Sequence, residues 1–127
     1  MFENILFPID PSRAAMDTAR KAVELARSNS SRLILLSVTE SESGETTVPE
    51  SVQSFLSQVR QEFEQVGIKC DVLERFGKPA FVICDVADEL DVDLIVMGTR
   101  GVNLEGDAES TAVRVIQLAP CPVLVVP

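Results

Sequence analysis

The sequence predicts an α/β protein built on an open, five-stranded parallel sheet. Short apolar runs alternate along the chain with stretches whose apolar residues recur at helical spacing. This alternation is typical of strands joined by right-handed helical crossovers, which make neighbouring strands parallel. Most of the runs are apolar throughout, and this favours strands that helices cover on both faces. A chain of 127 residues fits one domain, residues 1–127.

The first half of the chain predicts two strands, each followed by a helix. Residues 5–9 and 33–38 are the apolar runs. The first helix has an apolar face at helical spacing, formed by Ala15, Ala19, Ala22, Val23 and Ala26. Residues 40–50 are polar and acidic, which indicates a surface loop. The second helix shows the clearest amphipathic pattern and should end at Gly67; its apolar residues are Val52, Phe55, Leu56, Val59, Phe63 and Val66.

The second half predicts three strands and two helices. Residues 68–73 alternate between apolar and polar, as expected for a half-exposed edge strand. Pro79 stands near the start of the third helix. Residues 94–97 and 123–126 predict buried strands on either side of a last helix, whose shared face is Ala112, Val115, Ile116 and Ala119. A fully apolar strand at a sheet edge requires a cover, and a second copy of the chain is the simplest one.

The composition excludes several classes of function. A net charge of −9 argues against a nucleic-acid partner, because phosphate backbones require a basic face. The chain has no histidine, which excludes Ser-His-Asp and Cys-His catalysis. Three cysteines without a CxxC spacing argue against a disulfide framework or a metal site. No apolar run approaches the roughly 18 residues of a membrane span, and no signal peptide is apparent, so we expect a cytoplasmic protein.

Two predicted strand ends carry the candidate binding residues. Ligands of open parallel sheets bind beyond the carboxyl ends of the strands, where the winding direction reverses. Those ends are Ile9-Asp10 and Met97-Gly98 in this chain. The Asp10 carboxylate is suited to accept a hydrogen bond from an adenine amino group or a ribose hydroxyl. It is equally suited to cap a helix that begins with Pro11, and the two roles are compatible.

The segment that follows the fourth strand has two glycines and, further on, two hydroxyls. In Gly98-Thr99-Arg100-Gly101 the glycines would let the backbone approach an anion, or they simply form a turn. Ser110 or Thr111 would place a hydroxyl beside a phosphate at a helix N-terminus. The alternative is again a helix cap, provided by Ser110 or Asp107, and residue spacing does not separate these roles.

Five segments together resemble the universal stress protein family over essentially the whole chain. They are ILFPIDPS, LILLSV, GKPA, DLIVMGTRG and APCPVLVV, in this order. The resemblance implies a parallel sheet of strand order 3-2-1-4-5 with helices on both faces, a Rossmann-like fold of the adenine nucleotide alpha hydrolase type. It also implies homodimers paired through the last strand, residues 121–126 here. The resemblance indicates no protein partner other than a second copy of the chain.

The family contains members that bind ATP and members, such as the UspA type, that do not. Binders share a motif of Gly, two residues, Gly, nine residues, and then Gly followed by Ser or Thr. Gly98 and Gly101 match its first two glycines, and Ser110 matches the hydroxyl. Glu109 stands where the third glycine belongs, and seven residues, 102–108, precede it in place of nine. If nine residues are counted after Gly101, the position of the third glycine falls on Thr111, which is not a glycine either.

This chain matches the adenosine half of the family's site better than the phosphate half. Its matching positions for adenine and ribose are Pro8, Asp10, Val38 and Met97. On the phosphate side, Arg100 is the one nearby base, whereas residues 102–109 include Glu105, Asp107 and Glu109. A carboxylate about 4 Å from a phosphate charge costs roughly 1 kcal/mol in water and about 4 kcal/mol at a partly buried site. A micromolar ligand has only about 8 kcal/mol of binding free energy.

These observations predict a non-enzymatic, dimeric stress-response or signalling protein whose nucleotide site is weakened. The alternative is a nucleotide-dependent switch that binds ATP or AMP, with Mg²⁺ as a candidate bridge between carboxylates and phosphates. An ATP-hydrolysing enzyme is the least favoured reading, because no carboxylate or lysine is identifiably placed as a base.

Overall fold

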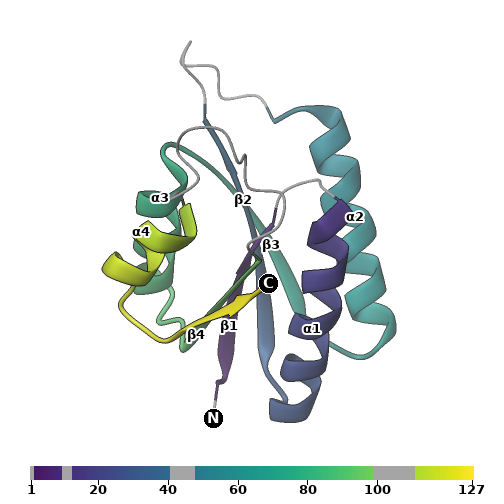
Figure 1. The fold of residues 1–127 in the computed structure, drawn as a ribbon. Coiled ribbons are helices and arrows are strands. Elements are labelled where there is room, and N and C mark those ends of the chain that lie inside the picture. The colour runs from purple at the N-terminus through teal and green to yellow at the C-terminus, as the bar shows by residue number, and fades with distance from the viewer. Residues whose placement is uncertain (1, 10–12, 41–47, 99–110) are drawn as a thin grey trace.

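The computed structural model describes residues 2–9, 13–40, 48–98 and 111–127, which form one sheet with helices on both faces (Figure 1). The strands within these residues are β1 (Asn4–Pro8), β2 (Arg32–Thr39), β3 (Cys70–Phe76), β4 (Leu94–Gly98) and β5 (Val123–Val126). The helices are α1 (Arg13–Asn29), α2 (Glu50–Gln65), α3 (Pro79–Glu89) and α4 (Thr111–Leu118). The predicted order of elements is therefore confirmed. No helix in this part of the chain is long and apolar enough to cross a membrane.

The strand order is β3-β2-β1-β4-β5, and every neighbouring pair is parallel. This confirms the order that the family resemblance implied. From β1 the chain winds outward through β2 and β3, and it then returns to the other side of β1 to form β4 and β5. Helices α1 and α2 cover one face of the sheet, and α3 and α4 cover the other (Figure 1). The winding direction thus reverses between β1 and β4.

The central strands contribute alternate residues to two hydrophobic cores. In β1, Ile5 and Phe7 belong to the core beneath α1 and α2, whereas Leu6 belongs to the core beneath α3 and α4. β2 divides in the same way, with Leu33 on the first face and Ile34 on the second. All five side chains are buried. Burial on both faces explains why these strands are apolar throughout and do not alternate.

The helices dock mainly through the faces that their sequences predicted, but the prediction was wrong for Val66 and Ile116, which are 44% and 55% exposed. The α1 face against the sheet consists of small side chains, Ala15, Ala19, Ala22 and Ala26, all buried, which bring the helix axis close to the strands. Helix α2 ends as expected beside Gly67, whose φ of 82° suits glycine. The amide of Gly67 donates to the Glu64 carbonyl at 3.0 Å, which satisfies an otherwise free helix-end acceptor.

The two edges of the sheet differ from each other. Strand β3 is an edge strand with mostly half-buried side chains, as its alternating sequence predicted. Strand β5 forms the opposite edge, and the expectation that it is buried like β4 is wrong for a single chain. Only Val126 of this strand is buried, and Leu124 is 43% exposed. The reason is geometric: an edge strand has one neighbour, and the helices of this chain leave Leu124 uncovered.

Candidate functional site

The carboxyl ends of β1, β2 and β4 meet at one edge of the sheet, and several of the predicted site residues lie there. Pro8 is the last residue of β1, Gly98 is the last residue of β4, and Val38 is the penultimate residue of β2. In the β1–β4 register, Leu6 pairs with Ile95, and the same offset brings Pro8 level with Met97. The structure therefore brings four of the predicted residues to the place where the winding reverses.

Three of these residues share one face of the sheet. Met97 is buried in the core beneath α3 and α4, and Val38 packs against that core. Pro8 follows Leu6 of the same core by two positions, so the alternation of a strand directs it to the same side. Pro8 and Val38 are half-buried, which leaves part of each side chain accessible. Together the three residues form an apolar surface at the carboxyl ends of the strands. We call these three residues the apolar trio.

Gly98 belongs to the opposite face, which it shares with α1. Leu94 and Val96, the alternate residues that precede Gly98 in β4, lie in the core beneath α1 and α2. A Cβ atom placed on Gly98 would lie 2.6 Å from Oγ1 of Thr18, a buried residue of α1. A glycine is therefore required here by helix-to-strand packing. The sequence had indicated two other roles for this glycine, a close approach of the backbone to an anion or a simple turn.

Thr18 is the residue near the site that the sequence reasoning missed. It completes the docking face of α1, because it lies three positions after Ala15 and four before Ala22. It is one of few polar side chains among the buried residues of the described chain, at 6% exposure. A threonine inside an alanine-rich helix face was the signal that could have identified it.

The remaining predicted residues divide into one that is described and four that are not. Thr111 is the first residue of α4 and is half-buried. Asp10, Arg100, Gly101 and Ser110 lie outside the described residues, as do the acidic residues of the segment 102–109. The structure thus describes the apolar part of the candidate site and the strand ends that carry it.

The described part of the site offers groups suited to binding. Its side chains are the apolar trio and the Thr111 hydroxyl, and none of them is an acid, a base or a thiol. No cluster of three or more histidine, cysteine or acidic residues suited to a metal ion occurs within the described ranges. Burial raises the pKa of the Cys70 thiol to about 12 and also raises the pKa of Cys84 and Cys121. The thiols are therefore protonated and weakly nucleophilic at neutral pH.

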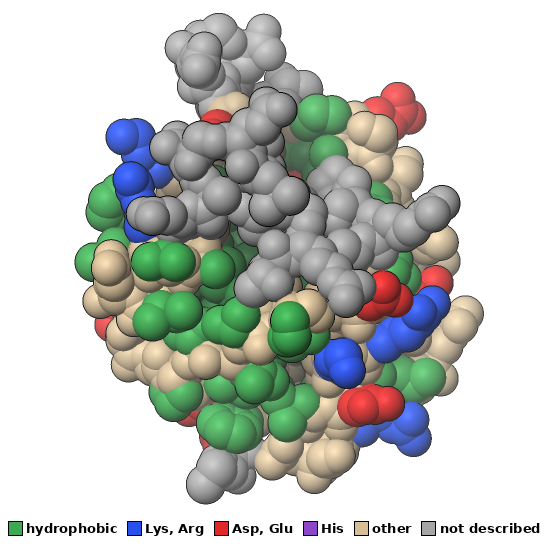
Figure 2. All heavy atoms as spheres, in the orientation of Figure 1, with side chains coloured by type: hydrophobic (Ala, Val, Ile, Leu, Met, Phe, Trp, Pro, Cys, Tyr) green, Lys and Arg blue, Asp and Glu red, His purple; other side chains and the backbone are tan. Residues whose placement is uncertain are grey.

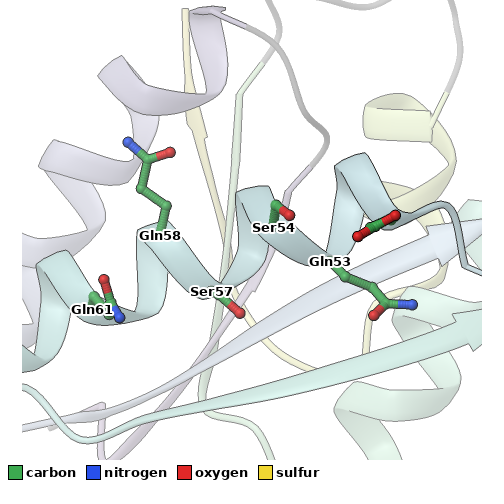
Figure 3. A pocket seen from close by; sticks show the side chains of 6 residues that line it. Gln53, Ser54, Ser57, Gln58 and Gln61 are labelled. Carbon is green, nitrogen blue, oxygen red and sulfur yellow. The ribbon is translucent and has the colours of Figure 1, made fainter.

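A separate depression of about 430 Å³ lies on α2 (Figure 3). Its lining residues all come from that one helix: Glu50, Gln53, Ser54, Ser57, Gln58 and Gln61. A binding cleft normally draws convergent groups from several elements and offers apolar walls. This depression has neither property, so we interpret it as the hydrated outer face of α2.

The fold and the candidate site define a doubly wound α/β protein with an apolar surface at its topological switch point, the position at which this class binds ligands. The model of the universal stress protein family matches residues 1–127, and the chain belongs to this family. Universal stress protein Sll1654 of Synechocystis sp. is 49% identical over 136 residues, which cover 100% of this chain and 87% of that relative.

Solved structures agree with this assignment. The structure of hypothetical protein MJ0577 superposes with a TM-score of 0.86 at 26% identity and covers 99% of this chain and 96% of its own. A universal stress protein from Archaeoglobus fulgidus, solved in complex with dAMP, has a TM-score of 0.76 at 26% identity, with 99% and 98% of the two chains covered. The family that the five sequence segments indicated is thereby confirmed.

Proposed function

We propose that this universal stress protein is a non-enzymatic stress-response protein that binds a nucleoside monophosphate in preference to ATP. One observation carries the proposal. The apolar trio is present at the strand ends, whereas the segment that follows Gly98 lacks the third glycine of the phosphate motif and carries three acidic residues. The adenosine half of the site is thus preserved better than the half that would hold a polyphosphate.

The adenosine half suits a flat, apolar base. Pro8 and Val38 each have accessible apolar surface beside the buried Met97. Burial of apolar surface contributes about 25 cal/mol per Å², so a base covering the trio gains binding energy without a charged group. Asp10 follows β1 directly in the sequence and supplies a carboxylate for an adenine amino group or a ribose hydroxyl. The dAMP bound by the Archaeoglobus relative supports this ligand class.

The phosphate half opposes added negative charge. Residues 99–110 contain one base, Arg100, and the acids Glu105, Asp107 and Glu109. Each carboxylate near a phosphate costs between about 1 and 4 kcal/mol, depending on burial. A triphosphate places more charge beside these acids than a monophosphate does. We therefore expect ATP to lose the affinity that its additional phosphates bring in a glycine-rich site, and Mg²⁺ to restore part of it.

Isothermal titration calorimetry with AMP and ATP, each with and without Mg²⁺, tests the proposal. We expect AMP to bind at least as tightly as ATP in the absence of metal, and Mg²⁺ to strengthen only the binding of ATP. GMP is the control for recognition of the base and should bind more weakly than AMP. A chain that binds ATP more than about tenfold tighter than AMP without metal, a difference of about 1.4 kcal/mol, would contradict the weakened phosphate half.

The second candidate is a nucleotide-dependent switch that retains ATP, and Gly98, Gly101 and Ser110 favour it because they match the phosphate motif. This alternative predicts nucleotide that survives purification. The denatured supernatant would then absorb near 260 nm and contain ATP by mass spectrometry. The chain has no tryptophan and no tyrosine, so its own absorbance interferes little with this measurement.

We also propose that two copies of the chain associate through β5. Leu124 of this edge strand is 43% exposed, and α4 exposes three more apolar side chains, Val113, Ile116 and Leu118. Figure 2 shows hydrophobic side chains gathered over α4 and β5 on one face of the molecule. An exposed apolar edge strand favours pairing with another strand, and a second copy offers an identical edge.

A further inference from the structure

We propose that Thr18 is a positioning residue for the nucleotide site: its side chain packs against Gly98 and fixes where the end of β4 lies relative to α1. This inference rests on the proposed function, because the β4 end carries Met97 of the apolar trio. Thr18 itself lies in the core beneath α1 and is not one of the residues of the apolar trio.

The space beside Gly98 on the α1 side is occupied by the Thr18 side chain. A Cβ on Gly98 would lie 2.6 Å from Thr18 Oγ1 and 3.5 Å from both Cβ and Cγ2 of the same side chain. Real Cβ atoms essentially never approach another heavy atom to 2.6 Å. Thr18 is β-branched and only 6% exposed, so its side chain has little free space into which a different χ1 rotamer could turn. Extra volume at position 98 must therefore be accommodated by a shift of α1 or of β4.

A shift of β4 would reach the apolar trio. Met97 directly precedes Gly98, and the two residues belong to opposite faces of the sheet. A displacement that relieves crowding on the α1 face consequently moves Met97 on the face of α3 and α4. The core does not absorb such movement easily, because Met97 and Val96 are buried and interiors are close-packed. The expected result is an altered apolar surface for the base, although neither Thr18 nor α1 contributes to that surface.

The distances predict which second substitution relieves the crowding. Thr18→Ala removes Oγ1 and Cγ2 and leaves only the Cβ, at 3.5 Å from the added atom, which is ordinary van der Waals contact. Thr18→Val has the shape of threonine and keeps a γ atom in the place of Oγ1, the atom at 2.6 Å. Thr18→Ala should therefore rescue Gly98→Ala, and Thr18→Val should not. This pair of variants separates helix packing from a need for bare backbone next to a ligand.

The experiment compares the wild-type chain with G98A, T18A, G98A/T18A and G98A/T18V. AMP affinity is measured by calorimetry, and the urea midpoint reports folding. We expect G98A to weaken AMP binding by at least about tenfold, and G98A/T18A to return to within about threefold of T18A, as a coupled pair should. G98A/T18V should remain as impaired as G98A. If G98A does not fold, a folded G98A/T18A that binds AMP supports the proposal equally.

Two results would overturn the positioning role: G98A that binds AMP like the wild type, or G98A/T18A that is as impaired as G98A. The second result would mean that the ligand itself needs a glycine at position 98. A wild-type chain that binds no AMP would instead contradict the proposed function. The two failures are therefore distinguishable in the same set of titrations.

Discussion

The backbone amide of Asn4 donates a hydrogen bond to Oδ2 of Asp93 at 2.9 Å, and the amide of Asp93 donates to the carbonyl of Asn4 at 2.9 Å. This reciprocal pair joins the amino end of β1 to the segment that leads into β4. The register continues directly from it, with Ile5 opposite Leu94 and Leu6 opposite Ile95. Strands β1 and β4, whose carboxyl ends carry residues of the candidate site, are thus hydrogen-bonded to each other near their amino ends.

Loss of the Asp93 side chain should therefore loosen the two central strands. Asp93→Ala leaves the half-buried amide of Asn4 without its acceptor, at a cost of about 1 to 3 kcal/mol in the free energy of unfolding. Asp93→Asn is the matched control, because its amide oxygen can still accept the bond, and it should lose less than half as much. Urea unfolding followed by circular dichroism measures both variants. Equal midpoints for Asp93→Ala and the wild type would show that the pair does not contribute.

The buried thiol of Cys70 predicts a loss of stability at high pH. Burial raises its pKa from 9.0 to about 12, so the folded chain retains the thiol proton to a higher pH than the unfolded chain does. The contribution of this group is complete below the unfolded pKa and is lost as the pH rises from about 9 toward about 12. The urea midpoint of the wild type should consequently fall between about pH 8 and about pH 10.5 more steeply than that of Cys70→Ala. Parallel slopes would contradict the assignment to Cys70.

The proposed dimer predicts that one charge on β5 disrupts association. Leu124→Lys places an ammonium group in the apolar edge and should give a monomer, or a precipitate if the exposed surface finds other partners. Val66→Lys is the matched control, because Val66 is 44% exposed, like Leu124 at 43%, but lies at the end of α2. Size-exclusion chromatography with light scattering reports the mass. A stable Leu124→Lys dimer would place the interface elsewhere, and a monomeric wild type would contradict the dimer itself.

The elements of this fold were predictable because local chemistry determines them. The end of α2 at Gly67 follows from the ease with which glycine adopts a positive φ, and the start of α3 at Pro79 follows from a fixed φ and a missing donor. The strand order came from the family resemblance, since apolar periodicity does not say which strands are neighbours. The sequence indicated that the last strand needs a cover but not whether this chain provides it, because an apolar run looks the same whether this chain or another covers it.

The candidate site was predictable in part for a related reason. The rule for open parallel sheets indicated the ends of the first and fourth strands, including Met97 and Gly98. Pro8 and Val38 came from the family resemblance. Thr18 stands out in the sequence as a polar residue on an alanine-rich helix face, but its role depends on the distance between α1 and β4, which the spacing within one helix does not give. The sequence left two roles open for Gly98, an anion-binding glycine or a simple turn, because its neighbours suggested a loop. Its packing against α1 became visible only when the two elements were brought together.

The acidic segment between Gly101 and Thr111 yields a prediction about ligand choice. Replacing Glu105, Asp107 and Glu109 by the corresponding amides removes three negative charges from the phosphate half of the motif. At about 1 kcal/mol or more for each nearby pair of charges, ATP affinity should rise at least about tenfold. AMP has one phosphate and should gain less than about threefold, because most of the repulsion acts on the outer phosphates.

A change in total charge would also strengthen anion binding, so the control must match it. Amide replacement of Asp85, Asp88 and Glu89 removes the same number of charges from exposed positions on α3. Helix α3 begins near the carboxyl end of β3 and runs back toward the amino ends of the strands. These residues therefore lie toward the amino ends of the strands, whereas the candidate site lies at their carboxyl ends. The control should change ATP affinity by less than about twofold at physiological salt, where charges more than about 8 Å apart are screened. Equal gains in the two triple variants would attribute the weak ATP site to net charge alone, whereas no gain in the first would mean that its carboxylates do not oppose the phosphates.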